Sequence, residues 1–286
     1  MKVNLRSVPG IFCLLLLLAA VLIPGLVRAD KIVRPELYPA ATDSWAPGML
    51  DIRFFNVGKG DAMLMHLPDG RFAMIDTGYA ETAPALIKKL KALGVKEISL
   101  LVITHHHKDH VGGYPFLLEA FPVNRVVQSY DPRDKEKCLV EAGTRLIKAG
   151  GVTLTVLGPT RSHKDENDAS LVCHLQFGRT SVLFAADAVE ESISDLLKDK
   201  KKLRADVLKV PHHGRFKGFS PRDFFAAVKA EYAIITSDEK AGDPPEGSVV
   251  RILKESGTRV LLTDELGDIQ FLSDGETIHY LPGEKK

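Results

Sequence analysis

Residues 103–113 read ITHHHKDHVGG and continue the apolar run ISLLV without a break. An apolar run of this length is typical of a strand buried on both faces of a sheet. Such a strand holds the backbone in place, while the loop that follows it lets several side chains converge on one point. The chain must therefore fold so that a buried strand ends in a histidine-rich loop.

The loop carries side chains that are suited to binding metal ions. His105 and His107 are two positions apart, so they point to the same side of an extended segment, and Asp109 and His110 follow at the turn. Imidazole and carboxylate together suit zinc, iron or manganese. Such ions lower the pKa of a bound water and supply hydroxide at neutral pH. A polar surface loop is the competing interpretation, but the strand before the loop favours a metal centre.

Residues 1–29 differ from the rest of the chain. Lys2 and Arg6 precede the apolar run IFCLLLLLAAVLI, and small or apolar residues lead to Ala29. This order is typical of a secretory signal peptide cut after Ala29; an uncleaved membrane anchor is the alternative. We expect an exported protein, periplasmic or secreted, that has no membrane association after cleavage.

The remainder divides into a short arm and one large domain. Residues 30–49 contain three prolines and no sustained periodicity, which predicts a linker or a surface arm. Residues 50–286 alternate short apolar runs with helical patterns, one of them KEKCLVEAGTRLIKAG. Two similar halves of this kind predict an α/β fold, with two sheets packed together and helices outside them.

Charge and cysteine content limit the partners and the covalent links. Residues 1–29 hold three basic residues and no acidic one, so the rest has 35 basic and 37 acidic residues and a net charge of −2. Any nucleic-acid contact must then be local, since bulk attraction to phosphate usually needs a basic protein. Cys138 and Cys173 remain after cleavage and form either one disulfide or two free thiols.

Several segments, taken in order, resemble one known family. THHHKDHVGG is similar to the HxHxDH signature of the metallo-β-lactamase fold. The segments FFNVGKGDAMLMHLPDGRFAMIDTG, NDASLVCHLQFGRTSVLFAADA, ADVLKVPHHG and TRVLLTDELGDIQF resemble the soluble C-terminal domain of competence proteins of the ComEC type. The resemblance implies a four-layer αββα sandwich with its metal site at one edge, between the sheets.

The resemblance also implies a set of ligands. His105 and His107 would bind one metal. Asp109 and His110 would bind the second, and Asp187 would bind both. His212 is favoured as the last ligand, with His213 left as a substrate or proton-transfer group, although the two can exchange roles. The remaining expectations are that Asp109 and His213 take part in catalysis, that Asp76 holds the metal loop by hydrogen bonds, and that His106 is a spacer facing away from the metals.

This chain departs from the family pattern near the expected site. Asn167 stands where many members have a histidine. The first metal site is therefore expected to be weak, to be occupied only when substrate is bound, or to favour manganese, although zinc is the preferred ion overall. His163 could substitute, but an exposed loop histidine is the favoured interpretation. Lys59, Arg215 and Lys217 place cations near the site, which would suit a phosphate group.

These expectations combine into a function. We expect an exported hydrolase with one or two divalent metals, acting as a phosphodiesterase or nuclease on nucleic acid or another phosphodiester through a metal-bound hydroxide. The resembling competence domain is proposed to degrade one DNA strand during uptake. The alternatives are hydrolysis of a small phosphodiester, lactam, lactone or thioester, and a non-catalytic metal-binding module. The oligomeric state stays open.

Overall fold

The computed structural model describes residues 45–131 and 134–282, with side chains left undescribed at 134–138. The expected signal peptide at 1–29 therefore lies outside the described residues. The same holds for the expected arm at 30–49 up to residue 44. The first described residue, Trp45, stacks on His66 with ring centroids 3.7 Å apart.

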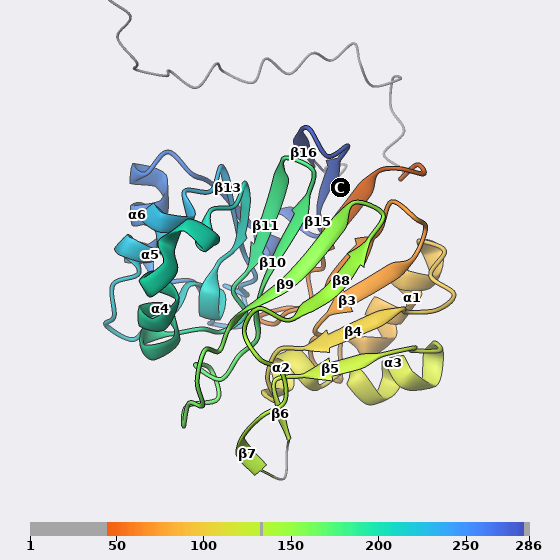
Figure 1. The fold of residues 1–286 in the computed structure, drawn as a ribbon, viewed down its shortest axis with the longest axis horizontal. Helices are drawn as coiled ribbons and strands as arrows, with labels where there is room; N and C mark the ends of the chain where they lie inside the picture. The colour runs from red at the N-terminus through yellow and green to blue at the C-terminus, as the bar shows by residue number, and fades with distance from the viewer. Residues whose placement is uncertain (1–44, 132–133, 283–286) are drawn as a thin grey trace, which may run out of the picture. The chain divides into compact units, whose positions relative to one another are not determined.

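Seven strands form the first sheet, in the order β16-β15-β1-β2-β3-β4-β5 (Figure 1). Its strands are β1 (Leu50–Phe54), β2 (Met63–His66), β3 (Phe72–Ile75), β4 (Leu100–Ile103), β5 (Val126–Gln128), β15 (Ile269–Ser273) and β16 (Ile278–Leu281). Strands β3, β4 and β5 are parallel, and the other pairs are antiparallel. Within the described residues, the last two strands thus complete the sheet that the first strand begins, with Leu50 opposite Ser273.

Seven further strands form the second sheet, in the order β14-β13-β12-β11-β10-β9-β8. Its strands are β8 (Arg145–Ala149), β9 (Val152–Gly158), β10 (Val172–Phe177), β11 (Thr180–Phe184), β12 (Val207–Lys209), β13 (Tyr232–Ile235) and β14 (Arg259–Leu262). Strands β11 to β14 are parallel to one another. Separately, β6 (Tyr130–Asp131) and β7 (Asp134–Cys138) pair as a small hairpin.

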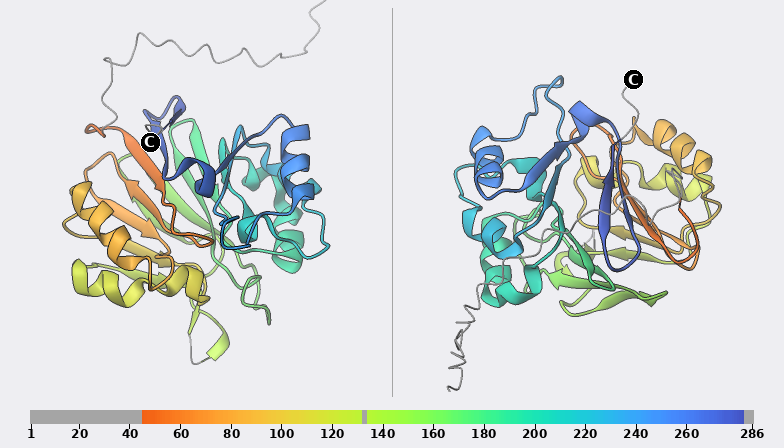
Figure 2. Two further views of the ribbon diagram at one scale, coloured as in Figure 1. Left: turned by 180° about the vertical axis from the view of Figure 1, so that it is seen from behind. Right: turned by 90° about the horizontal axis from the view of Figure 1, so that it is seen from above.

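Helices cover the outer faces of both sheets, as Figure 2 shows from above. The helices are α1 (Ala83–Ala92), α2 (Lys108–Val111), α3 (Tyr114–Ala120), α4 (Glu190–Leu196), α5 (Arg222–Val228), α6 (Gly247–Glu255) and α7 (Thr263–Leu266), with 3-10 segments η2 (Leu197–Leu203) and η3 (Pro211–Gly214). Buried residues of α1 and α3 join one apolar cluster with the first sheet, and those of α4, α5 and α6 join another with the second sheet. The expected α/β sandwich of four layers is confirmed.

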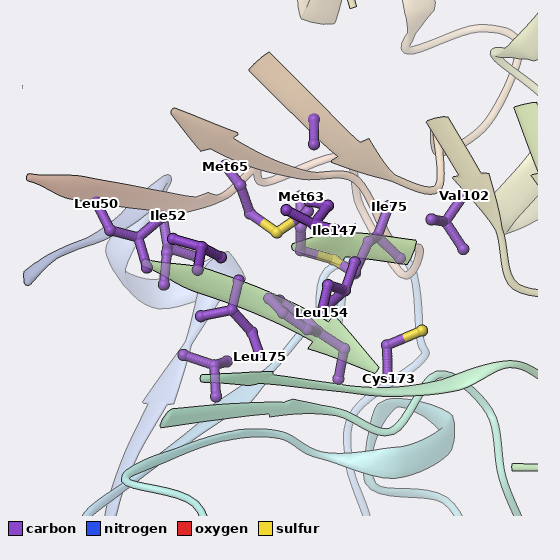
Figure 3. Packing of buried hydrophobic residues seen from close by; sticks show 14 of the residues in the cluster. Leu50, Ile52, Met63, Met65, Ile75, Val102, Ile147, Leu154, Cys173 and Leu175 are labelled. Carbon is purple, nitrogen blue, oxygen red and sulfur yellow. The ribbon is translucent and has the colours of Figure 1, made fainter. Parts of the chain in front are cut away.

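The largest core lies between the two sheets. Inward-facing side chains from both sheets interdigitate there, among them Leu50, Ile52, Leu154 and Leu175 (Figure 3). Full burial of each such side chain contributes about 1.5–3 kcal/mol. Cys173 points into this core as a free thiol whose pKa is raised by burial to about 12. The alternative of a free cysteine, rather than a disulfide, therefore holds for Cys173.

The prediction of a helix over KEKCLVEAGTRLIKAG is wrong, because this segment forms β7 and β8 instead. Gly143 adopts φ +93 between them, a conformation that interrupts a helix. Strand β8 then pairs antiparallel with β9 and buries Leu146 and Ile147 against the core. Pairing with a neighbouring strand outweighs the helical spacing. Within residues 45–131 and 134–282, no helix combines the length and apolar character that crossing a bilayer requires.

Candidate metal centre

Strands of both sheets end at one edge of the sandwich, and their carboxyl ends carry the polar side chains. Asp76 follows β3, and the histidine loop follows β4. On the second sheet, Asp187 follows β11 and the PHHG segment follows β12. The carboxyl ends of parallel strands lie on one side of a sheet, so each sheet delivers its ligands to the same place.

Four buried side chains from the two sheets form one candidate metal site, which we call the second group because it contains the residues expected at the second metal. Its members are Asp109, His110, Asp187 and His213, and their ligand atoms all lie within 4.8 Å of one another. Oδ1 of Asp187 lies 3.2 Å from Nε2 of His110 and 3.4 Å from Nε2 of His213. Nε2 of His213 lies 3.6 Å from Oδ2 of Asp109. The donors thus face a common centre.

Three side chains form an adjacent first group: His105, His107 and Asp187. Nε2 of His105 lies 3.8 Å from Oδ2 of Asp187 and 3.0 Å from Nδ1 of His107. Asp187 directs Oδ1 to the second group and Oδ2 to the first, which is the arrangement that a bridging carboxylate needs. His107 is 42% exposed, so the first group opens to solvent.

The chemistry of the donor set fits a divalent cation. Nε2 of His110, Nε2 of His213 and Oδ1 of Asp187 are buried and have no hydrogen-bond partner among the described residues. Each unpaired buried polar atom of this kind costs about 1–3 kcal/mol. The three atoms converge, so a single cation would satisfy all of them.

Electrostatics within the second group favour an ionised ligand. Burial alone raises the pKa of Asp187, but the facing imidazoles of His110 and His213 hold this pKa well below its ordinary range. The same two rings outweigh burial at Asp109, whose pKa is also lowered. Both carboxyl groups are therefore available as anionic ligands at neutral pH.

Asp76 holds the histidine loop through three hydrogen bonds. Its carboxylate accepts from the backbone N–H of Thr104 at 2.8 Å, from the Thr104 hydroxyl at 2.6 Å and from Nδ1 of His110 at 2.8 Å. Nδ1 of His110 donates here, so Nε2 is the ring atom that faces the second group. Burial alone would lower the pKa of His110, but the carboxylates of Asp187 and Asp76 raise it well above its ordinary value, so a metal at Nε2 would displace a proton. This geometry matches the role that the sequence led us to expect for Asp76.

The structure brings His213, and not His212, into the second group. Both residues lie in η3 with positive φ values, 47° for His212 and 53° for His213. Nε2 of His212 is 4.0 Å from Oδ2 of Asp187, and its Nδ1 lies 2.5 Å from the Arg215 carbonyl oxygen. His212 is also 12% exposed, whereas His213 is fully buried. This geometry favours exchanging the two expected roles.

One of the three expected cations lies at the metal centre. Nζ of Lys59 is 3.1 Å from Oδ2 of Asp109, and its side chain remains 21% exposed. Burial would lower the pKa of Lys59, but the Asp109 carboxylate raises it overall. Arg215 instead pairs with Asp243, and the backbone N–H of Lys217 donates to Glu246.

Three other expected positions are Asn167, His106 and His163. The amide oxygen of Asn167 is buried and has no hydrogen-bond partner among the described residues. His106 packs against Tyr130 and belongs to neither ligand group. His163 is 5% exposed and lies 3.3 Å from Glu191, so the expectation of an exposed loop histidine is wrong.

Sequence reasoning missed several polar residues beside the site, some of them fully buried. Glu166 accepts a hydrogen bond from Tyr130 at 2.8 Å and lies 3.8 Å from Nε2 of His107. Asp61 and Lys209 form a fully buried ion pair at 2.5 Å. A lysine within the apolar strand VLKV and an aspartate before AMLM were the available signals, because charged residues are seldom buried unless they are paired.

Comparisons with known proteins agree with this geometry. A family model described as the metallo-beta-lactamase superfamily matches residues 56–234. The chain is 28% identical over 268 residues to ComE operon protein 3 of Bacillus subtilis (strain 168), which covers 82% of this chain and 34% of that relative. It is 29% identical over 260 residues to competence protein ComA of Neisseria gonorrhoeae, covering 88% of this chain and 35% of that protein.

The chain thus spans about a third of the length of these curated relatives. Among solved structures, the metallo-beta-lactamase fold protein YhfI from Bacillus subtilis is similar with a TM-score of 0.55 and 12% sequence identity. That similarity covers 78% of this chain and 100% of the other. At this identity the likeness concerns the fold alone.

Proposed function

Since the chain belongs to the metallo-beta-lactamase superfamily, we propose that it is a metal-dependent hydrolase of phosphodiester bonds, in nucleic acid or in a smaller diester. The observation that carries the proposal is the second ligand group with Lys59 beside it, 3.1 Å from Asp109. A lysine ammonium at the mouth of a metal centre suits an anionic substrate. The similarity to ComE operon protein 3 and to competence protein ComA supports the same substrate class.

In this proposal the two ligand groups hold two ions. His105, His107 and Asp187 would hold the first ion, and Asp109, His110, Asp187 and His213 would hold the second. Divalent ions supply Lewis acidity there, which activates water and balances the charge on the phosphoryl oxygens. Zinc suits the imidazole-rich set, and manganese also suits the mixed carboxylate and imidazole donors.

The protein's own groups then bind and orient the substrate. The ammonium of Lys59 pairs with a non-bridging oxygen, while the carboxylates of Asp109 and Asp187 orient the attacking water. His212 is partly exposed and lies at the edge of the group, where its Nε2 can take a proton from the attacking water and pass it to the leaving oxygen. Nδ1 of His212 is held by the Arg215 carbonyl, which fixes the ring for this transfer.

We also propose that the enzyme acts outside the cytoplasm, in the periplasm or as a secreted protein. The basic start, apolar centre and small-residue exit of residues 1–29 support this proposal. Amino-terminal sequencing of protein recovered from the medium or the periplasm is expected to begin at Asp30. A chain that begins at Met1 in the membrane fraction would contradict cleavage.

A substrate panel tests the reaction. Single-stranded DNA, RNA, bis-p-nitrophenyl phosphate and nitrocefin should be offered to the protein loaded with zinc and, separately, with manganese. We expect cleavage of phosphodiesters that stops when a chelator is added. Turnover of nitrocefin alone would overturn the substrate class. Less than one equivalent of bound metal, together with indifference to the chelator, would instead indicate a non-catalytic module.

Variants test the two adjacent histidines. His213→Ala is expected to lose one metal equivalent together with activity, because it removes a buried ligand. His212→Ala is expected to keep its metal and lose about 10²–10⁴-fold in kcat, the usual contribution of proton transfer. His106→Ala is the matched control and should cost far less than either. Metal loss in His212→Ala with full retention in His213→Ala would reverse the assignment.

A further inference from the structure

A buried lysine lies directly behind the second group. Lys209 ends β12 in the interior of the second sheet, and its side chain is fully buried. Its Nζ lies 2.5 Å from Oδ2 of Asp61 and donates to the Ala186 carbonyl oxygen at 3.2 Å. A buried ammonium is costly, and replacing a buried ion pair by apolar residues is often neutral or stabilising. This pair therefore calls for a role other than stability.

Asp61 connects the pair to the other sheet. It lies in the loop between β1 and β2, and its backbone N–H donates to the Asp109 carbonyl at 3.0 Å. Its carboxylate oxygen Oδ1 accepts a hydrogen bond from the Thr236 hydroxyl at 2.7 Å. Thr236 immediately follows β13 and is fully buried as well. One carboxylate thus joins residues from both sheets.

The directions of these hydrogen bonds determine the tautomer of His213. Ionised Asp61 can only accept, so the single proton of the Thr236 hydroxyl points to it. The Thr236 oxygen must then accept from Nδ1 of His213, 2.8 Å away. Nδ1 carries the hydrogen, and Nε2 keeps a lone pair facing Asp109 and Asp187.

Lys209 also restrains the ligand that the two groups share. Ala186 precedes Asp187 and adopts φ 47°, a left-handed conformation that costs energy in a residue with a side chain. Its carbonyl oxygen accepts from Nζ of Lys209 and from the backbone N–H of His212 at 2.9 Å. These two bonds hold the turn that aims Asp187 at the second group.

We propose that Asp61, Thr236 and Lys209 form a positioning unit for the second metal site. The unit sets the tautomer of His213 and holds the turn before Asp187. The first sheet has the same sequence of contacts, from a carboxylate through a threonine hydroxyl to a ligand histidine. There the Thr104 hydroxyl donates to Asp76 and lies 3.2 Å from Nδ1 of His105. Two buried carboxylates thus each act on a ligand histidine through a threonine hydroxyl, and Lys209 provides the charge that balances Asp61.

Thr236→Val tests the unit because it removes the hydroxyl while keeping the shape of the side chain. We expect the affinity for the second zinc ion, measured by competition with a chromophoric chelator, to fall about 10–100-fold. In zinc-free protein, ¹⁵N NMR of the histidine rings should show His213 change from one tautomer to a mixture. Thr236→Ser keeps the hydroxyl and should stay within about threefold of the wild type.

Wild-type zinc affinity in Thr236→Val, or an unchanged Nδ1–H tautomer at His213, would overturn the inference. Equal losses in the valine and serine variants would also overturn it, since these would reflect packing and not the hydroxyl. Lys209→Met should reduce the affinity for the second ion by a similar factor. If that variant fails to fold, the Thr236 pair still decides the matter.

The inference rests on the metal centre of the proposed function and not on the bond that is cleaved. Zinc affinity and ring NMR need no substrate, so failure of phosphodiester hydrolysis would leave both readouts interpretable. Conversely, an active phosphodiesterase whose Thr236→Val variant binds zinc normally would overturn only the positioning unit.

Discussion

Lys59 is the one of the three expected cations that the structure places at the metal centre. Its ammonium pairs with Asp109, which is also a candidate metal ligand, so the cation and a metal ion compete for the same carboxylate. When a phosphate group is present, the ammonium has an alternative anionic partner close by. Lys59 is therefore expected to support substrate binding more than metal binding.

Lys59→Met is expected to raise KM for bis-p-nitrophenyl phosphate about tenfold, since a hydrogen bond to a charged group contributes about 1.5–3 kcal/mol and partial exposure reduces this. Zinc affinity should stay equal or rise, because Asp109 loses a competitor. Steady-state kinetics and a chelator titration measure both effects. Lys108→Met is the matched control, since Nζ of Lys108 lies over the Tyr79 ring at 5.9 Å. An unchanged KM in Lys59→Met would contradict the assignment.

At this scale the sequence pointed to residues that follow strands within a motif, and missed those that only packing brings near. His105, His107, Asp109, His110 and Asp187 all lie in the two groups. The choice between the two histidines of PHHG could not be made from spacing, because both have positive φ and strand alternation no longer applies to them. Partners such as Asp61 and Thr236 are 175 positions apart, so no local pattern joins them.

The residue before α3, Gly113, shows how glycine lets an element approach the site. An added Cβ at Gly113 would lie 2.4 Å from the Thr77 carbonyl oxygen, and Gly113 donates to the Gly78 carbonyl at 2.9 Å. Thr77 in turn donates through its backbone N–H to the His110 carbonyl at 2.7 Å. A side chain at Gly113 would therefore displace the segment that carries a ligand.

Gly113→Ala is expected to lower the free energy of unfolding by about 1–3 kcal/mol, the usual cost of overpacking, and to reduce zinc content. Urea denaturation and metal analysis measure the two effects. Gly247→Ala offers the control, because its added Cβ has no atom within 4 Å and it begins α6 without a positive φ. It should be neutral, or stabilising by up to about 1 kcal/mol. Equal midpoints for the two variants would refute the close approach.

Most elements were predictable because their apolar periodicity matches what the sheets bury. Strand β9, for example, buries alternate residues from Val152 onward. The segment that forms β7 and β8 was not predictable in this way. Its apolar spacing is typical of a helix, whereas Gly143 and the pairing of β8 with β9 decide its structure. The information needed there lies in a neighbouring strand.

Across the whole molecule, the proposed ions would bind between two sheets that are held together mainly by their shared core. The ligands follow β4, β11 and β12 in the chain, so one ion would contact both halves of the sandwich. Any ligand that binds only the folded state stabilises it, by about 4 kcal/mol when its concentration is 1,000 times its Kd. Removing the metal should therefore weaken the whole fold and not a single loop.

We expect EDTA to lower Tm by about 10 °C in one cooperative transition, since a domain of this size loses about 2–4 °C per kcal/mol. Differential scanning calorimetry with and without zinc measures this shift. His213→Ala should show a smaller response to EDTA, because it lacks one ligand. A Tm that does not respond to EDTA in the wild-type protein would contradict metal binding between the sheets.

The pairing of β1 with β15 means that the first sheet can be completed only late in synthesis of the chain. The Asp51 carboxylate of β1 accepts a hydrogen bond from the side-chain amide of Gln270 in β15, which lies 219 positions later in the chain. At a synthesis rate of about 5–20 residues per second, the edge of β1 waits about 10–40 s for the strand that covers it. An uncovered strand edge can pair with another chain. For this protein, the nascent chain is therefore most exposed to aggregation before its last two strands have emerged.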